Sequence, residues 1–227
     1  MFRFKIPHIS TTKYTRSLLT ALTLCAGTVG AYAYARNHKE NQSKITGEAD
    51  LGGDFTLTDT NNQPVSSTDL RGTYLLIYFG FTRCPDICPT EMHKLTAVTT
   101  ALANKKAAWS NLVRPVFITI DPQRDTPDAI KAYLSTFSSP VPILGLTGSP
   151  QDTAAAAKAY KVFSYPVPVD DEEGADEGDY LIDHSIFIFL VGPDGKYLAH
   201  FGYDKSVSYV IDGVAKHLPR EWWEFWL

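Results

Sequence analysis

The sequence has few cysteines, and it has little basic charge beyond the N-terminal segment. Each shortage excludes one class of protein. Three cysteines in 227 residues are too few for a scaffold held together by disulfides. Residues 1–39 hold six basic residues and no acidic one, which leaves 15 basic against 25 acidic residues in the rest of the chain. That net charge of -10 argues against a nucleic-acid partner, because phosphate binding needs a basic surface.

The sequence also lacks internal repeats and low-complexity stretches. Its apolar share of 44% is close to the average of globular proteins and excludes a disordered chain. A length of 227 residues fits one domain of generous size, or one domain with attachments. We therefore expect a single core.

An attachment is predicted at the N-terminus, where residues 17–35 run for nineteen positions without a charge. A helix of this length crosses a hydrocarbon core of about 30 Å. The segment 1–16 carries four basic residues, and is predicted to be a targeting segment or to lie in the cytoplasm or matrix. A cleaved signal peptide is the main alternative, since 31–33 and 33–35 have the small-x-small pattern. A buried globular helix is the third. Under either leading interpretation the remaining chain lies across the membrane.

After a polar linker at 36–49, residues 50–218 are predicted to form one α/β domain. Continuous apolar runs are typical of strands that are buried on both faces of a sheet. Four such runs occur, at 74–79, 116–120, 143–146 and 186–191. An edge hairpin is predicted around 55–65, where two short strand signals flank a Thr-Asn-Asn turn.

Helix signals lie between these runs. At 126–127 and at 149–150 a hydroxyl residue precedes proline, which is the pattern of an N-cap followed by the first helical residue. Residues 90–104 place apolar side chains along one helical face, and 207–218 are predicted to form a closing helix. The Gly-Pro-Asp-Gly turn at 192–195 joins two strands. The alternation predicts a three-layer βαβ-type domain with a hairpin at its end.

Cys84 and Cys88 lie where the first buried strand ends and a helix begins. Their spacing lets two thiolates converge at a helix N-terminus, which stabilises negative charge. Such a pair can exchange disulfides, reduce peroxide or hold a soft metal. The spacing is one residue longer than the C-x-x-C of disulfide exchange, and neither cysteine has the threonine three residues earlier that peroxiredoxins place there. A metal would need a third ligand, because two thiolates leave Cu(I) or Zn(II) undercoordinated.

His184 is the candidate third ligand, because it stands at the mouth of the strand at 186–191, directly after an acidic loop. Taken alone, a single histidine is more often structural than metal-binding. Asp86 lies between the two cysteines and Asp183 beside the histidine. Each of these carboxylates could orient a ligand or attract a cationic partner, and a solvated surface role is the equal alternative.

Asp121 follows the second buried strand and points to the same edge of the sheet. We interpret it as part of a helix-capping turn made with Arg124 and Asp125, in preference to a role in metal binding. The remaining histidines, none of which shares a loop with the dithiol, are His8, His38, His93, His200 and His217.

Two further segments, the acidic loop and the C-terminal tail, each allow more than one interpretation. The loop at 170–179 contains seven acidic residues and two glycines, so it is predicted to be mobile and solvated. It is either a plain exposed loop, or a gate for His184 or a dock for a basic partner. The tail at 219–227 holds three of the four tryptophans. It is predicted either to cover an apolar edge of the domain or to rest at a membrane interface.

Four motifs occur in order along the chain, YFGFTRCPDICP at 78–89, DPQRDTP at 121–127, DHSI at 183–186 and GPDG at 192–195. Together they resemble the Sco/SenC family over roughly residues 50–218. The resemblance implies a thioredoxin-like fold, a central mixed sheet flanked by helices, tethered by a single N-terminal transmembrane helix. It also implies a metallochaperone, not an enzyme, that delivers copper to the dinuclear copper centre of cytochrome c oxidase. By this match the copper ligands are Cys84, Cys88 and His184.

The resemblance suggests the mitochondrial inner membrane, with the domain in the intermembrane space; a bacterial inner membrane facing the periplasm is the alternative. Cu(I) is the expected cargo because it prefers soft thiolates. Whether the site also holds Cu(II) is an open question at this point. The expected partners are the copper-bearing oxidase subunit, an upstream copper donor and a thiol reductant. Two other functions stay open. One is a membrane-anchored thiol-disulfide oxidoreductase, which would need the cysteines but not His184, and the other is a copper or redox sensor.

Overall fold

The computed structural model describes residues 51–168 and 180–219 of the chain. The predicted N-terminal segment, transmembrane helix and linker (1–49) lie outside the described residues, as do the acidic loop at 170–179 and the tail beyond residue 219. Among the helices of the described ranges, none combines the length and the apolar character needed to span a membrane.

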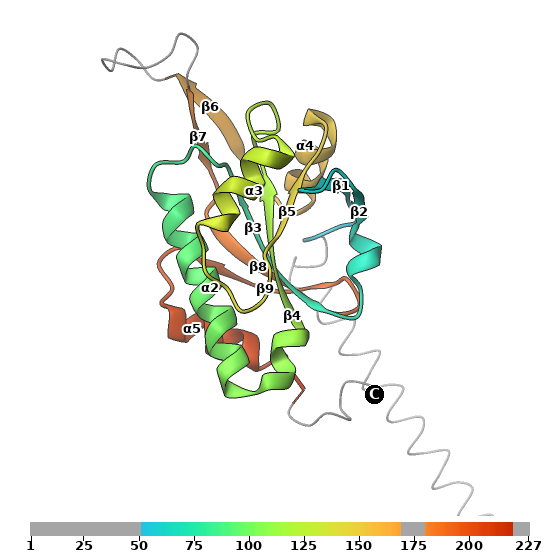
Figure 1. The fold of residues 1–227 in the computed structure, drawn as a ribbon, viewed down its shortest axis with the longest axis vertical. Coiled ribbons are helices and arrows are strands. Elements are labelled where there is room, and N and C mark those ends of the chain that lie inside the picture. The colour runs from blue at the N-terminus through green and yellow to red at the C-terminus, as the bar shows by residue number, and fades with distance from the viewer. Residues whose placement is uncertain (1–50, 169–179, 220–227) are drawn as a thin grey trace, which may run out of the picture. The chain divides into compact units, whose positions relative to one another are not determined.

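The core of the domain is a seven-stranded mixed sheet with the strand order β2-β1-β5-β4-β3-β8-β9 (Figure 1). The two central pairs, β3 with β4 and β4 with β5, are parallel, and the other pairs are antiparallel. The strands of this sheet are β1 (Thr56–Asp59), β2 (Pro64–Ser66), β3 (Tyr74–Gly80), β4 (Val113–Thr119), β5 (Leu144–Thr147), β8 (Phe187–Val191) and β9 (Tyr197–Gly202). The predicted apolar runs and the edge hairpin are therefore confirmed as strands.

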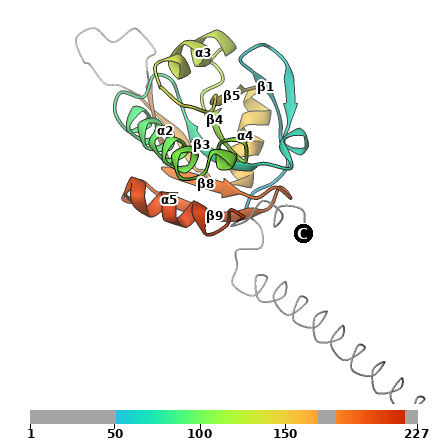
Figure 2. The same ribbon diagram turned by 60° about the horizontal axis from the view of Figure 1, so that its bottom comes forward.

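Helices cover both faces of this sheet. The α-helices are α2 (Ile87–Lys105), α3 (Pro127–Ser135), α4 (Pro150–Ala159) and α5 (Val207–Ala215), and two short 3-10 helices are η1 (Ser67–Leu70) and η2 (Ala107–Asn111). Leu76 and Tyr78 of β3 pack in one core cluster with α2, α3 and α5, whereas Ile77 and Phe79 pack in a second cluster with α4. Successive residues of a strand point to opposite faces, so β3 supplies both cores. Helices α2 and α5 lie side by side on the first face (Figures 1 and 2).

The two predicted helix starts are confirmed in detail. The Thr126 side chain accepts a hydrogen bond from the backbone N–H of Ala129, and the Ser149 side chain accepts one from Asp152. Proline follows each cap at the first helical position, where its missing N–H costs nothing. The three-layer α/β architecture that the sequence predicts is thus the observed one.

One element was not predicted, a separate two-stranded antiparallel sheet made of β6 (Ser164–Pro168) and β7 (Tyr180–His184). This ribbon lies at the upper end of the domain in Figure 1. Prolines at 166 and 168 weaken the strand signal because proline cannot donate to a ladder. They are tolerated here because β6 has β7 as its one neighbour within the described ranges. The ribbon matters because β7 ends at the predicted ligand histidine.

Candidate metal centre at the end of β3

Both cysteines lie at the junction between β3 and α2. The loop that follows Gly80 carries Cys84, whose side chain is partly exposed, and Cys88 is fully buried in the first turn of α2. The backbone N–H of Cys88 donates to the Cys84 sulfur at 3.3 Å. This places the Cys84 sulfur at a helix N-terminus, where backbone N–H groups favour a thiolate.

Gly80 allows the close approach of the helix to the strand. A Cβ atom at this position would lie 2.8 Å from a ring carbon of Tyr78 and 2.9 Å from the Cys88 sulfur. Real Cβ atoms do not make such short contacts, because close-packed interiors have no free volume to absorb them. The strand therefore ends in the one residue type that lets Cys88 sit against it.

His184 reaches the same place from β7. Its Nε2 atom lies 3.6 Å from the Cys88 sulfur, and its Nδ1 atom lies 3.0 Å from the carbonyl oxygen of Ser185. A proton on Nδ1 that is donated to this carbonyl leaves Nε2 with a lone pair directed to the thiols. The rings of Tyr78 and Phe81 meet the imidazole edge-on, with centroid distances of 6.3 and 6.0 Å, and hold its plane.

The two thiols are electrostatically coupled. The hydrogen bond with Cys88 is the largest cause that lowers the pKa of Cys84 to about 4, and the His184 side chain and the N–H groups of Cys88 and Asp86 add to it against burial. The same bond with Cys84, followed by burial, raises the pKa of Cys88, although the Tyr78 hydroxyl, 3.4 Å from its sulfur, opposes that shift. The thiolate form is therefore favoured at Cys84 and disfavoured at Cys88, and the titration of the pair belongs to both residues together.

The donor distances can be compared with those of a metal site. Two donors on one ion, with bonds of about 2.3 Å to sulfur and 2.0 Å to nitrogen at a roughly tetrahedral angle, lie about 3.5 Å apart. The observed 3.6 Å between the Cys88 sulfur and His184 Nε2 fits this value. No three His, Cys, Asp or Glu side chains of residues 51–168 and 180–219 already stand in complete metal-ligand geometry. The three side chains thus meet, but a shared ion would require a local adjustment of their positions.

The other candidate residues take different places. Asp86 is exposed and makes no side-chain cap on α2. Asp183 is also exposed, and it accepts a hydrogen bond from the Tyr165 hydroxyl at 2.6 Å rather than contacting the imidazole. His93 packs on Phe137 and is exposed. The solvated surface role is therefore the better account of both carboxylates.

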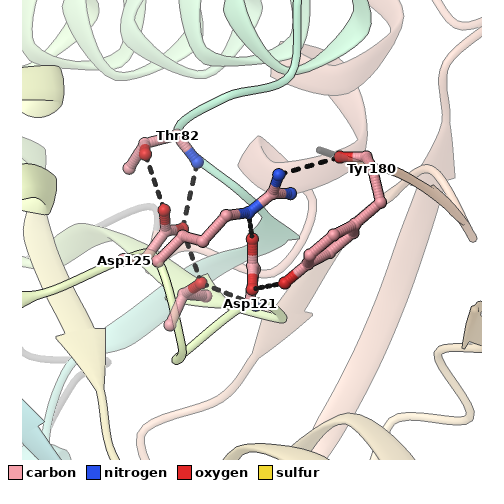
Figure 3. Close-up of polar contacts among 6 residues, drawn as sticks. Thr82, Asp121, Asp125 and Tyr180 are labelled. Atoms are coloured by element: carbon pink, nitrogen blue, oxygen red, sulfur yellow. Dashed lines mark hydrogen bonds and ion pairs between the residues drawn. The ribbon is translucent and has the colours of Figure 1, made fainter. Parts of the chain in front are cut away.

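The residues of the DPQRDTP motif form a buried polar network at the neighbouring loop (Figure 3). The backbone N–H of Asp125 donates to the Asp121 carbonyl at 2.9 Å, and the Arg124 guanidinium pairs with the Asp121 carboxylate. The predicted turn with Arg124 and Asp125 is thus present, but its capping role is wrong, because Thr126 and not Asp121 caps α3. Asp125 also accepts hydrogen bonds from the Thr82 hydroxyl and from Thr119, both at 2.6 Å. Burial raises the pKa of Asp125, and these hydroxyl bonds oppose the shift.

A cavity of about 550 Å³ borders this network, between the end of β4, α4 and the β6–β7 ribbon. Its lining includes Ile120, Pro150 and Ile182 but neither cysteine nor His184. It is therefore separate from the thiol site. Sequence reasoning missed Tyr78 and Tyr180 as neighbours of the functional residues, since no spacing rule connects either tyrosine to its partner.

Comparison with known proteins places the chain among relatives of one family. The sequence profile of the SCO1/SenC family matches residues 43–219. The mitochondrial SCO1 homolog of Mus musculus is 39% identical over 180 residues, which are 79% of this chain and 60% of that protein. A SCO2-like protein of Rickettsia felis is 43% identical over 162 residues, which cover 71% of this chain and 74% of that one.

Solved structures share the fold. The crystal structure of Arabidopsis thaliana ScoI with copper bound is 36% identical and has a TM-score of 0.66, covering 74% of this chain and 97% of that chain. BsSco, a member of the Sco family of cytochrome c oxidase assembly proteins in which a disulfide switch was identified, is 25% identical with a TM-score of 0.54, covering 76% of this chain and 96% of that chain.

Proposed function

The chain belongs to the SCO1/SenC family, and from that premise we propose that it is a copper chaperone. It binds one copper ion through Cys84, Cys88 and His184 and delivers the ion to the dinuclear copper centre of cytochrome c oxidase during assembly. A relative with bound copper and a relative described as an oxidase assembly protein support this proposal. A single N-terminal transmembrane helix tethers the domain to the mitochondrial inner membrane, on the intermembrane-space side.

One observation carries the proposal: the His184 imidazole, from a separate sheet, stands 3.6 Å from the sulfur of a cysteine 96 positions earlier in the chain. Two soft sulfur donors and one imidazole suit Cu(I), which accepts three ligands. A neutral imidazole is held less tightly than a thiolate, so His184 is the ligand that leaves first when copper is passed on. A small movement of the partly exposed Cys84 side chain would complete the ligand set.

The electrostatics of the pair also suit a carrier. Because the pKa of Cys84 is lowered and that of Cys88 is raised, copper binding has to displace mainly the thiol proton of Cys88. Oxidation of the two cysteines to a disulfide removes both sulfur ligands. Copper loading therefore depends on a thiol reductant in the compartment. The partners that follow are an upstream Cu(I) donor and the copper-bearing subunit of the oxidase.

Copper transfer tests this function. The full-length chain, loaded with Cu(I) under reducing conditions, is mixed with a soluble form of the copper-bearing oxidase domain, and copper in each protein is measured after separation. We expect transfer from the native chain, none from Cys84→Ser or Cys88→Ser, which do not hold Cu(I) tightly, and reduced loading for His184→Ala. Full loading of either cysteine variant would contradict the ligand assignment.

A second function is favoured by the unequal exposure of the two cysteines, because Cys84 is partly exposed and Cys88 is buried. A partly exposed thiolate beside a buried thiol is the arrangement of a disulfide reductase. The Cys84 thiolate would attack a substrate disulfide and release one substrate thiolate, and Cys88 would then displace the second substrate sulfur and leave a Cys84–Cys88 disulfide for a thiol reductant to restore. The activity would survive His184→Ala, whereas tight copper binding would not, and this difference separates the two functions.

A further inference from the structure

The proposed ligands come from two parts of the fold that no shared ladder of hydrogen bonds connects. Cys84 and Cys88 follow β3 of the main sheet, in the loop after Gly80 and in the first turn of α2, but His184 ends β7, which pairs with β6 in a sheet of its own. On one side β7 continues into β8, three residues after His184. Its other end, at Tyr180, lies about 13 Å away, at 3.3 Å per residue. Ile182 of β7 packs against the first core cluster, and beyond that contact the orientation of this end of the ribbon depends on what fixes Tyr180.

Two charged side chains of the 121–125 turn hold Tyr180 at three points. Its hydroxyl donates to Asp121 Oδ1 at 2.7 Å, its carbonyl oxygen accepts from Arg124 Nη1 at 2.9 Å, and the guanidinium lies 3.6 Å from the centre of its ring. The Arg124 Nε atom pairs with the second carboxylate oxygen of Asp121. The Asp121 and Arg124 side chains are 2% and 13% exposed, so these two partners are largely shielded from solvent, whereas Tyr180 is half-buried.

The same turn holds the cysteine loop. Asp125 is fully buried, and it accepts hydrogen bonds from the backbone N–H and the hydroxyl of Thr82, at 3.0 and 2.6 Å. Thr82 is two residues before Cys84. Figure 3 shows both arms of the network, Thr82 on Asp125 and Tyr180 on Asp121, meeting in one short turn.

We infer that the turn at 121–125 is a positioning element for the metal site: it holds the histidine strand and the cysteine loop in register with each other. The inference rests on the proposed function, because it assumes that His184 is a ligand. Asp121, Arg124 and Asp125 are positioning residues, since they act on His184 and Cys84 through Tyr180 and Thr82 and are not among the proposed ligands.

A double-mutant cycle on the full-length chain tests this role. Tyr180→Phe removes the hydroxyl bond to Asp121 and keeps the ring over Arg124. Cu(I) affinity is measured by competition with a chromogenic Cu(I) chelator in four proteins: the native chain, Tyr180→Phe, His184→Ala and the double variant. Tyr165→Phe is the matched control, because it removes a tyrosine-to-aspartate hydrogen bond, to Asp183, from the same ribbon. Thermal unfolding checks that each protein is folded.

We expect Tyr180→Phe to lower the Cu(I) affinity about tenfold in the native background. This loss corresponds to the free energy of one hydrogen bond to a charged group. It should cause no further loss once His184 is alanine, because a positioning residue has nothing left to position. Arg124→Lys keeps the charge but loses the planar fork, and it should show the same pattern. Tyr165→Phe should leave the affinity unchanged.

Three results would overturn the inference: equal losses with and without His184, no loss in the native background, or a loss of the same size in Tyr165→Phe. Failure of the proposed function looks different. In that case His184→Ala itself binds Cu(I) with native affinity, whatever Tyr180→Phe does.

Discussion

The contact between β3 and the first turn of α2 yields a sharp prediction for Gly80→Ala. The added methyl group would lie 2.8 Å from Tyr78 and 2.9 Å from the Cys88 sulfur. Neither neighbour can move away easily, because both side chains are fully buried. The helix start, and Cys88 with it, must shift away from the strand.

The magnitude follows from overpacking. Forcing one methyl group into a close-packed core costs about 1–3 kcal/mol of unfolding free energy. For a domain of this size each kcal/mol lowers the melting temperature by about 2–4 °C, so Gly80→Ala should melt about 2–12 °C below the native chain. Because the displaced atom is a ligand sulfur, the Cu(I) affinity should fall as well, by about tenfold for a site misplaced by a fraction of an ångström.

Gly148→Ala is the matched control. Its added methyl group would lie 2.9 Å from Leu57, in the core on the other face of the sheet. Thermal unfolding and Cu(I) competition are measured on both variants. We expect both to lose stability and Gly80→Ala alone to lose affinity. Native affinity in a destabilised Gly80→Ala would refute the account of why glycine stands there.

Three further predictions concern single residues. Cys84 should react with iodoacetamide at a rate that falls only as the pH drops towards about 4, the value to which its pKa is lowered, while Cys88 stays unreactive in the folded chain. Peptide mass spectrometry measures the labelling of each cysteine. Faster labelling of Cys88 than of Cys84 would contradict this prediction. Glu91→Gln should lower the free energy of unfolding by about 1–3 kcal/mol, because it removes the ion pair with Lys94. In the native chain the Lys94 nitrogen lies 2.6 Å from the Glu91 carboxylate, which is 2% exposed. An unchanged urea midpoint would show that the ion pair contributes nothing to stability. Thr126→Ala should cost about 1 kcal/mol by removing the α3 cap, and Thr126→Ser should restore it; equal stabilities of the alanine and serine variants would contradict the cap.

The strands and helix starts could be predicted because their signals are local. Continuous apolar runs of four to six residues stay buried whichever neighbours they find, and Thr126 and Ser149 each cap a helix with a proline next to them. The β6–β7 ribbon could not be predicted in this way. Its prolines at 166 and 168 oppose a strand locally, and the ladder with β7 outweighs them.

The candidate site likewise contains residues with a local sequence signal and residues whose role depends on the fold. Cys84 and Cys88 are recognisable from their spacing at a strand-to-helix junction, and the family resemblance adds His184. Tyr78 and Tyr180 escape such reasoning, because a tyrosine in a strand is usually explained by packing. Their roles depend on which loops the fold brings together, at the paired ends of β3 and β4. The ligand role of His184, the membrane helix at 17–35 and the tail at 219–227 stay predictions.

X-ray absorption at the copper edge, on the full-length chain loaded under reducing conditions, tests the central claim most directly. The account predicts one Cu(I) per chain with two sulfur ligands and one nitrogen ligand, and loss of the nitrogen ligand alone in His184→Ala. A copper site that keeps its nitrogen ligand in His184→Ala, or keeps both sulfur ligands in Cys84→Ser, would contradict it.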